Sequence, residues 1–233
     1  MHILITGAGR GLGLELAKLA AEKGHEVIAC VRDPENVPGP LNELKDKHPG
    51  KVRIERLGVT NEAEAKALAD KLGSEGIRLG GLVNNAAVLL GREHKLGELP
   101  IELVRESLEV NLLGPMNAAK YLAPLMANHA GAVVANISSE AGSFASAYGG
   151  DYPYALSKAA LNYFSKQLGS ELKGRGIRTI AVHPGWIRTD MGGQAAPMGP
   201  SESAEGILAI LEGRVRLEDD DFFVDHKGQR MPL

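Results

Sequence analysis

Residues 2–13 read HILITGAGRGLG, and this stretch decides the fold. A short apolar run leads into four glycines within seven residues, and leucines and alanines at helical spacing follow from Leu14. A strand, a glycine turn and a helix in this order let free backbone N–H groups approach a pyrophosphate. A plain strand-to-helix turn needs fewer glycines, so we predict a dinucleotide-binding loop. Its spacing from Thr6 to Gly13 is Thr-Gly-x-x-x-Gly-x-Gly rather than G-x-G-x-x-G.

Length and composition are those of one α/β domain covering residues 1–233. The formal net charge is -3 without a basic stripe, which disfavours nucleic acid and anionic membranes as partners. Cys30 is the only cysteine, so no intrachain disulfide forms, and its apolar run predicts a buried strand position. The seven histidines lack zinc-like spacing, so we predict no metal. Without a membrane-length apolar run or room for a leader peptide, we expect a cytoplasmic protein that binds a small molecule.

Alternating apolar runs and helical patterns predict the architecture. Seven β-rich runs are expected as strands, at residues 2–6, 26–31, 52–57, 79–84, 132–137, 178–183 and 222–224. Helical patterns occupy residues 12–22, 41–47, 62–72, 101–128, 154–173 and 201–211. This alternation predicts an α/β, Rossmann-type, doubly wound and mostly parallel seven-stranded sheet with helices on both faces, in a single domain.

Glycine and polar motifs follow five of the predicted strands. They are the glycine loop, Arg32, the run NNAA at residues 84–87, the pair Ser138-Ser139, and Pro184-Gly185. In open parallel sheets, ligands bind outside the carboxyl ends of the strands. We therefore expect all five motifs to belong to one site.

Tyr154 precedes Lys158 by four residues, which places phenol and ammonium on one face of a predicted helix. Asp151 and Pro153 are typical of a helix start, so Tyr154 is expected in the first turn. A neighbouring cation and the helix dipole both lower a tyrosine pKa from its usual value of about 10. The pair therefore predicts a tuned acid/base.

Taken with Asn111 and the run HPGWIRT at residues 183–189, these motifs make the chain resemble the short-chain dehydrogenases/reductases over essentially its whole length. Residues 30–34, 149–150, 183–186 and 222–228 are most similar to the small sniffer-type and C-factor-like carbonyl reductases. The resemblance implies hydride transfer between a nicotinamide dinucleotide and a carbonyl or alcohol.

The resemblance also implies roles for individual residues. Tyr154 would protonate the carbonyl oxygen, or act as base in the reverse direction, and Lys158 would lower its pKa and bind the nicotinamide ribose. Ser139 would hold the substrate oxygen, and Asn111 would support a water relay to Lys158. The implied cofactor-binding set is Gly7, Arg10, Gly11, Leu12, Gly13, Arg32, Val59, Asn85, Ala86, Tyr154, Lys158, Pro184, Gly185, Ile187 and Thr189.

The spacing between the serine and the tyrosine departs from the family pattern. Ser139 lies 15 residues before Tyr154 where relatives have 13, and residues 148–151 are the natural place for a two-residue insertion. We therefore assign the role to Ser139 and treat Ser138 as its structural neighbour. A strand-end hydroxyl that caps backbone is the alternative for both serines.

Three further positions leave alternatives open. Ala87 replaces the usual glycine, and Gly58 replaces an aspartate that relatives use to bind the adenine amine. Backbone contacts, for instance from Val59, would remain. Asn111 could instead be a buried helix residue that hydrogen-bonds to the backbone.

The charge of the side chains at the end of the second strand distinguishes a site for NAD from a site for NADP. An NAD site needs a carboxylate for the ribose hydroxyls, whereas an NADP site needs a guanidinium for the 2′-phosphate. Val31 occupies the position of that acid, Arg32 follows it, and Arg10 offers a second cation. We predict NADP(H) in preference to NAD(H). The alternative is that Asp33 accepts the ribose hydroxyls while both arginines face solvent.

Two regions predict contacts beyond the cofactor. Residues 184–200 form a loop that can close over substrate, and Trp186, Met191, Met198 and Phe144 would line an apolar pocket, although Trp186 could equally belong to the core. The expected helix at residues 101–128 has apolar side chains on more than one face. Relatives pair through this helix and the Tyr154 helix, which implies a homodimer or homotetramer.

The leading hypothesis is an NADP-dependent carbonyl reductase acting on a small or medium apolar ketone or aldehyde, or an alcohol dehydrogenase in the reverse direction. The rival is an NADP(H)-binding regulatory or signalling protein on the same fold, as C-factor-like relatives suggest. An intact set of Ser139, Tyr154, Lys158 and Asn111 favours the enzyme, because a sensor needs no proton carrier.

Overall fold

The computed structural model describes residues 1–126 and 131–233. Its strands are β1 (His2–Thr6), β2 (Glu26–Val31), β3 (Val52–Arg56), β4 (Leu79–Asn84), β5 (Ala132–Ile137), β6 (Ile177–His183) and β7 (Phe223–Asp225). They form a seven-stranded sheet in the order β3-β2-β1-β4-β5-β6-β7. The predicted fold class is confirmed, and every pair of neighbouring strands is parallel, so the sheet is wholly rather than mostly parallel.

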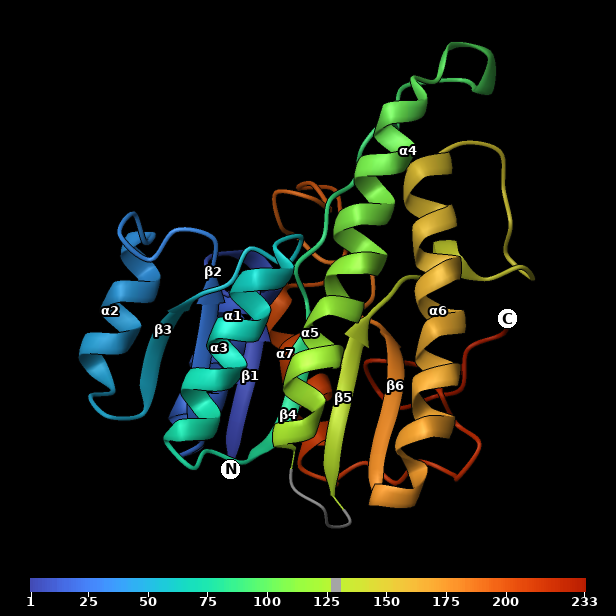
Figure 1. Ribbon diagram of the computed structural model, residues 1–233. Coiled ribbons are helices and arrows are strands. Elements are labelled where there is room, and N and C mark those ends of the chain that lie inside the picture. Colours follow the sequence, from blue (N-terminus) through green and yellow to red (C-terminus); the bar gives the residue numbers. More distant parts are fainter. Residues whose placement is uncertain (127–130) are drawn as a thin grey trace.

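Helices cover both faces of this sheet. They are α1 (Gly11–Glu22), α2 (Gly39–Lys47), α3 (Glu62–Ser74), α4 (Ile101–Leu108), α5 (Gly114–Leu122), α6 (Tyr152–Leu172) and α7 (Pro200–Leu211). Helices α3, α5 and α6 lie in front of the sheet in Figure 1, and α1 and α7 lie behind it. Because strand side chains alternate between faces, Ile3 and Ile5 pack into one core and Leu4 into the other.

The prediction of a single helix at residues 101–128 was wrong. The chain instead forms α4, a π-helical turn η2 (Glu109–Leu113), α5 and a 3₁₀ turn η3 (Ala123–Leu125), and residues 127 and 128 lie outside the described residues. Pro115 has no N–H for the carbonyl of Asn111, four residues earlier, so the α-helical pattern cannot continue there. The longer bond from Gly114 N to the Glu109 oxygen belongs to this turn.

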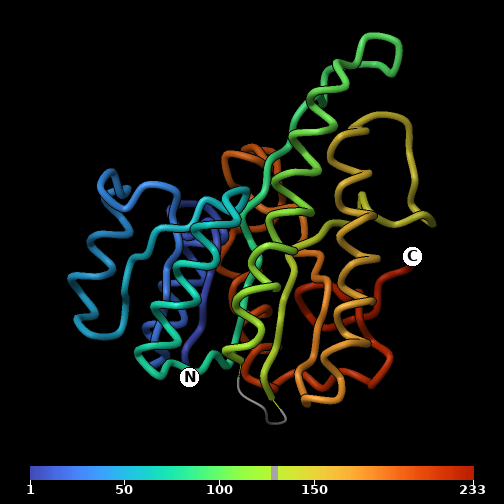
Figure 2. Tube along the Cα trace, viewed as in Figure 1, coloured from blue at the N-terminus to red at the C-terminus, as the bar shows by residue number. Residues whose placement is uncertain are grey.

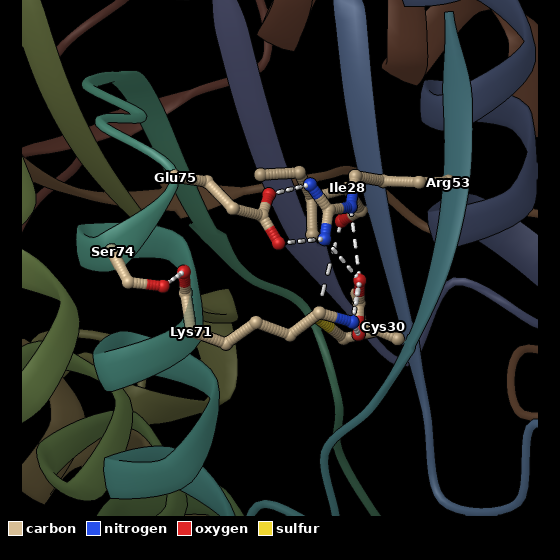
Figure 3. A network of polar contacts seen from close by, with 7 residues as sticks. Ile28, Cys30, Arg53, Lys71, Ser74 and Glu75 are labelled. Atoms are coloured by element: carbon tan, nitrogen blue, oxygen red, sulfur yellow. Dashed lines mark hydrogen bonds and ion pairs between the residues drawn. The ribbon is translucent and has the colours of Figure 1, made fainter. Parts of the chain in front are cut away.

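Strand β3 at the edge of the sheet is joined to α3 by charged side chains (Figure 3). The Arg53 guanidinium donates to both Glu55 and Glu75, and Lys71 Nζ donates to the two Glu55 oxygens at 2.8 and 2.9 Å. Cys30 lies beside this network in β2 and is fully buried, as predicted. Burial raises the pKa of its thiol, so Cys30 is an unreactive core residue.

The loops at the carboxyl ends of the strands form the upper edge of the molecule in Figures 1 and 2. One short turn there, η4 (Glu140–Gly142), lies directly against α6. A Cβ atom on Gly142 would lie 2.6 Å from the carbonyl carbon of Lys158 and 2.8 Å from the nitrogen of Ala159. The missing side chain therefore sets how closely the end of β5 approaches α6.

We expect Gly142→Ala to lower the free energy of unfolding by about 1–3 kcal/mol, because the added methyl forces α6 away from the turn. Urea denaturation followed by circular dichroism measures the change. The control is Gly149→Ala, at an exposed position where a Cβ atom would meet nothing within 4 Å. An equal loss in both variants would contradict the close packing at Gly142.

Candidate active site

A cleft of about 1030 Å³ opens at the carboxyl edge of the sheet. The loops after β1, β2, β4, β5 and β6 all contribute to its lining. Every residue predicted to bind the cofactor lines this cleft except Gly13, and so do Ser139, Tyr154 and Lys158 of the predicted catalytic residues. Motifs that are far apart in the sequence thus meet in one cleft, whereas Asn111 lies outside its lining.

The glycine loop is shaped by close contacts with the loop after β4. Gly7 has φ +65, and a Cβ atom on it would lie 2.9 Å from the Ala86 Cα. A Cβ atom on Gly13 would lie 2.4 Å from the Gly7 oxygen and 2.5 Å from the Asn85 amide nitrogen. Gly13 therefore permits packing of α1 against this loop instead of lining the cleft.

Helix α1 begins at Gly11 beside the cleft, with no side-chain cap and no acidic residue in its first turn. Its first N–H groups and the positive end of its dipole are therefore left for an anion. The loop in front of it is held by Thr6, whose hydroxyl accepts from the backbone nitrogens of Asn85 at 3.0 Å and Ala86 at 3.1 Å. Asn85 in turn donates to the backbone oxygens of Thr6 and Gly7.

Tyr154 and Lys158 lie on one face of α6, and Tyr154 is in its first turn, as predicted. The Lys158 Nζ lies 5.5 Å from the centroid of the Tyr154 ring. Lys158 is 2% exposed, and its ammonium donates a 2.6 Å hydrogen bond to the backbone oxygen of Ile137, at the end of β5. This contact fixes the lysine between sheet and helix.

The expectation that Lys158 and the dipole lower the pKa of Tyr154 was wrong for the described structure. Burial raises the pKa of Tyr154, while a hydrogen bond with Ser139 and the charge of Arg92 act in the opposite direction. Burial also lowers the pKa of Lys158 to about 7. A low-dielectric site disfavours phenolate and ammonium alike, and burial is the largest cause of both pKa shifts.

The two serines after β5 face different partners. The Ser138 side chain is buried and donates to Asn162 Oδ1 at 2.5 Å. The Ser139 side chain lines the cleft, hydrogen-bonds Tyr154 and accepts from the Ala141 nitrogen at 3.1 Å. Of the two hydroxyls, only that of Ser139 bonds Tyr154.

Asn111 is fully buried in the π-helical turn. Its Oδ1 accepts from the Val88 nitrogen at 2.8 Å, and its Nδ2 donates to the Val88 oxygen and to Ser157 Oγ, both at 2.9 Å. The side chain thus fastens the loop after β4 to the helices, which is the alternative left open from the sequence. A water relay from Asn111 to Lys158 stays a prediction.

Arg32, at the end of β2, has a guanidinium that is available to bind an anion. Arg32 is exposed, lines the cleft and has no side-chain hydrogen bond or ion pair with the described residues. Asp33 already accepts from the Glu35 nitrogen at 3.1 Å and from Asn36 Nδ2 at 2.6 Å. Arg10 is paired with Asp190 at 2.8 Å. Arg32 is therefore the cation whose donors remain available at this end of the cleft.

Two of the four residues predicted to line an apolar pocket line the cleft. Trp186 and Met191 line the cleft, and Trp186 is 53% exposed, which excludes the core alternative. Phe144 is 80% exposed and lies outside the lining. Met198 is also outside it, because its side chain packs under Gly185.

Arg92 and Asp151 are cleft residues that the sequence analysis missed. The sequence predicts Asp151 only as a helix-start residue and gives no signal for Arg92. The two side chains form an ion pair across 59 residues of sequence. No motif signals such a pair, because the loops that carry it meet only in the folded chain.

Among residues 1–126 and 131–233, no group of three or more histidine, cysteine or acidic side chains is arranged to hold a metal ion. No helix in this part of the chain combines the length and apolar character that crossing a membrane requires.

The family model for short chain dehydrogenases matches residues 1–198. Carbonyl reductase family member 4 of Danio rerio is 32% identical, covering 90% of each chain. C-signal of Myxococcus xanthus is 34% identical over 65% of this chain and 90% of its own. NADPH-bound carbonyl reductase from chicken fatty liver has a TM-score of 0.90 at 31% identity, covering 100% of this chain and 98% of its own. Carbonyl reductase Sniffer of D. melanogaster has a TM-score of 0.89 at 28% identity, covering 100% and 99%.

We expect Lys158→Met to stabilise the cofactor-free protein by about 1–3 kcal/mol at pH 7, because it removes the burial penalty of the ammonium and loses one hydrogen bond. The folded pKa of about 7 lies below the usual 10.5, so between these values the unfolded chain binds more protons. The penalty is largest below pH 7 and disappears as the pH rises to 10.5.

Thermal unfolding of both proteins at several pH values measures this gain. The control is Lys166→Met, at an exposed position on the same helix. A gain that did not shrink as the pH rises would contradict the assignment of the low pKa to Lys158.

Proposed function

The chain belongs to the short-chain dehydrogenase family, and from this we propose that it is an NADPH-dependent carbonyl reductase, or an alcohol dehydrogenase in the reverse direction. The proposed substrate is a small or medium apolar ketone or aldehyde. One observation carries the proposal. A phenol, a buried ammonium and a serine hydroxyl meet in the cleft whose lining also contains a glycine loop, an uncapped helix end and Arg32.

The residues of the cleft fit a dinucleotide. Gly7 and Gly11 have positive φ and expose backbone, and a side chain at Gly7 would press on the loop after β4. The pyrophosphate would lie against the first turn of α1. Backbone groups near Val59 and the turn at Asn85 and Ala86 would hold the adenosine half. Residues Pro184, Gly185, Ile187 and Thr189 would hold the nicotinamide half.

The reduction needs a proton donor beside a reactive carbonyl. When bound, NADPH supplies the hydride. In the proposed roles, Ser139 holds the carbonyl oxygen and Tyr154 gives it a proton, so charge does not build up on that oxygen. In its protonated form, Lys158 would stabilise the phenolate left behind. Asn111 keeps the surrounding loop in position.

The preference for NADP(H) rests on Arg32. Its unpaired guanidinium at the end of β2 matches a 2′-phosphate, while the carboxylate of Asp33 is occupied by its own turn. The similar chicken carbonyl reductase holds NADPH, and a similar Burkholderia multivorans protein holds NADP. Arg10 would contribute less, because it is already paired.

A regulatory role is the second candidate, and the similarity to C-signal favours it. In that role the output would be contact with a partner instead of turnover. The complete proton-transfer set of Ser139, Tyr154 and Lys158 favours the enzyme. A cytoplasmic location stays a prediction.

We also propose a homodimer or homotetramer. Leu156 and Tyr163 of α6 are 55% and 69% exposed, and Met116 of α5 is 40% exposed. Apolar side chains exposed on neighbouring helices are typical of a subunit contact. A monomeric mass by light scattering at assay concentration would refute this proposal.

We expect Tyr154→Phe to lower the rate of NADPH oxidation with a panel of ketones and aldehydes about 10²–10⁴-fold, because the variant lacks the proton donor. NADPH binding, measured by fluorescence, should stay within about twofold, since the ring remains in place. Carbonyl turnover that survives this substitution would refute the assignment. NADPH binding without turnover of any carbonyl in the wild type would favour the regulatory role.

We expect Arg32→Asp to lower the ratio of kcat/KM for NADPH over NADH about 10–100-fold, the effect of losing a charge-assisted hydrogen bond of 1.5–3 kcal/mol. Arg10→Gln serves as the matched comparison and should change the ratio less, because Arg10 already pairs with Asp190. Unchanged use of NADPH by Arg32→Asp would show that Arg32 faces solvent without binding the phosphate.

A further inference from the structure

Arg92, Tyr148 and Asp151 form a cluster in the lining of the cleft that has no role in the reaction described above. Arg92 Nε lies 3.2 Å from Asp151 Oδ1, and its Nη2 lies 3.5 Å from Oδ2. Tyr148 donates its hydroxyl to Asp151 Oδ2 at 2.9 Å. The cluster therefore joins the loop after β4 to the loop before α6, and both rise above the sheet in Figure 2.

Asp151 is the centre of this cluster and has an unusual backbone. Its φ of 47 and ψ of 27 are left-handed, and no other non-glycine residue among those described has a positive φ. Such a conformation is unfavourable for a side-chain-bearing residue and tends to occur at functional sites. Asp151 also starts α6, since its carbonyl accepts from the Ala155 nitrogen at 2.8 Å. One residue thus sets the start of the Tyr154 helix and the position of Arg92.

The two members of the ion pair act on Tyr154 in opposite directions. Arg92 lowers the pKa of the phenol and Asp151 raises it. The other charged or titratable groups of the cleft lining on α6 and on the elements near it are Lys158 on the same helix, Tyr148 before it, Glu106 from α4, Glu140 from η4 and His183 from β6. Arg92 and Asp151 form an ion pair with each other.

We propose that Arg92 and Asp151 are a positioning pair for proton transfer, which holds the start of α6 and Tyr148 at the cleft and acts on the proton donor with two opposed charges. This inference rests on the proposed reductase function. It adds two residues to those identified from the sequence motifs. Neither residue exchanges a proton with the substrate, because their action passes through Tyr154.

The test compares the pH dependence of kcat/KM in Asp151→Asn and Arg92→Gln. Tyr154 must be protonated to act in reduction, so activity falls as the pH rises through its pKa. We expect this fall to move to lower pH in Asp151→Asn and to higher pH in Arg92→Gln, by roughly 0.5–1 pH unit each. Asparagine tolerates the left-handed backbone, so Asp151→Asn removes the charge while keeping the geometry.

The matched control is Arg230→Gln, which removes an arginine from an ion pair with Asp221 outside the cleft and should leave the pH profile unchanged. Loss of rate or thermal stability without opposite pH shifts would show that Arg92 and Asp151 are only structural, and would overturn the inference. If Asp151→Asn does not fold, Asp151→Gly, which also accepts the left-handed backbone, takes its place with the same expected shift.

A second measurement separates this inference from the proposed function. Ultraviolet absorbance follows ionisation of tyrosine, and subtracting the titration of Tyr154→Phe in each background isolates Tyr154 without any turnover. Opposite shifts without carbonyl reduction by the wild type would refute the proposed function and retain the pair. Carbonyl reduction by the wild type, without opposite shifts of the Tyr154 pKa in the two variants, would retain the proposed function and refute the role of the pair.

Discussion

The hydrogen bond from the buried Lys158 ammonium to the Ile137 carbonyl is the interaction on which the cleft depends, because it fastens α6 to the end of β5. Placing an ammonium in a low-dielectric site is unfavourable, as its lowered pKa indicates. This unfavourable burial occurs where α6, which carries Tyr154, meets the end of β5, which leads to Ser139. A neutral side chain would pack there with less penalty, but it could not stabilise a phenolate, which is the role we propose for Lys158. In this proposal the protein loses stability at the site in exchange for catalytic activity.

The buried polar side chains around this contact act as a positioning frame. Asn84 bonds Asn136, Asn136 bonds Ser165, Ser138 bonds Asn162, and Asn111 bonds Ser157, all at 2.9 Å or less. Three of these partners, Ser157, Asn162 and Ser165, come from the buried face of α6. A hydrogen bond specifies direction as well as distance, whereas apolar contact allows a helix to slide or rotate. This explains why the sheet-facing side of α6 is polar near the cleft.

The two ends of the cleft are lined by different kinds of chemical group. The end at the glycine loop, where we propose that the cofactor binds, is lined by glycines, backbone groups and the exposed Arg32. The other end, where we propose that the substrate binds, is lined by side chains from separate loops, among them Tyr148, Asp151, Trp186 and Met191. The full-length structural similarity to carbonyl reductases reflects the shared fold, whereas substrate specificity depends on those loops. Two chains with the same frame can therefore differ in substrate.

The sequence by itself determined the parallel sheet, the glycine turn, the position of Tyr154 in its helix and the burial of Cys30, because each depends on local periodicity or on spacing within a few residues. The break near Pro115 was also readable, since a proline cannot donate to Asn111, but the apolar pattern concealed it. Only the tertiary structure decided which serine hydroxyl reaches Tyr154, that Met198 and Phe144 lie outside the cleft lining, and that burial raises the pKa of Tyr154. It also brought Arg92 to Asp151. Burial and contacts between distant loops depend on how all the elements pack together, and no local pattern in the chain records them.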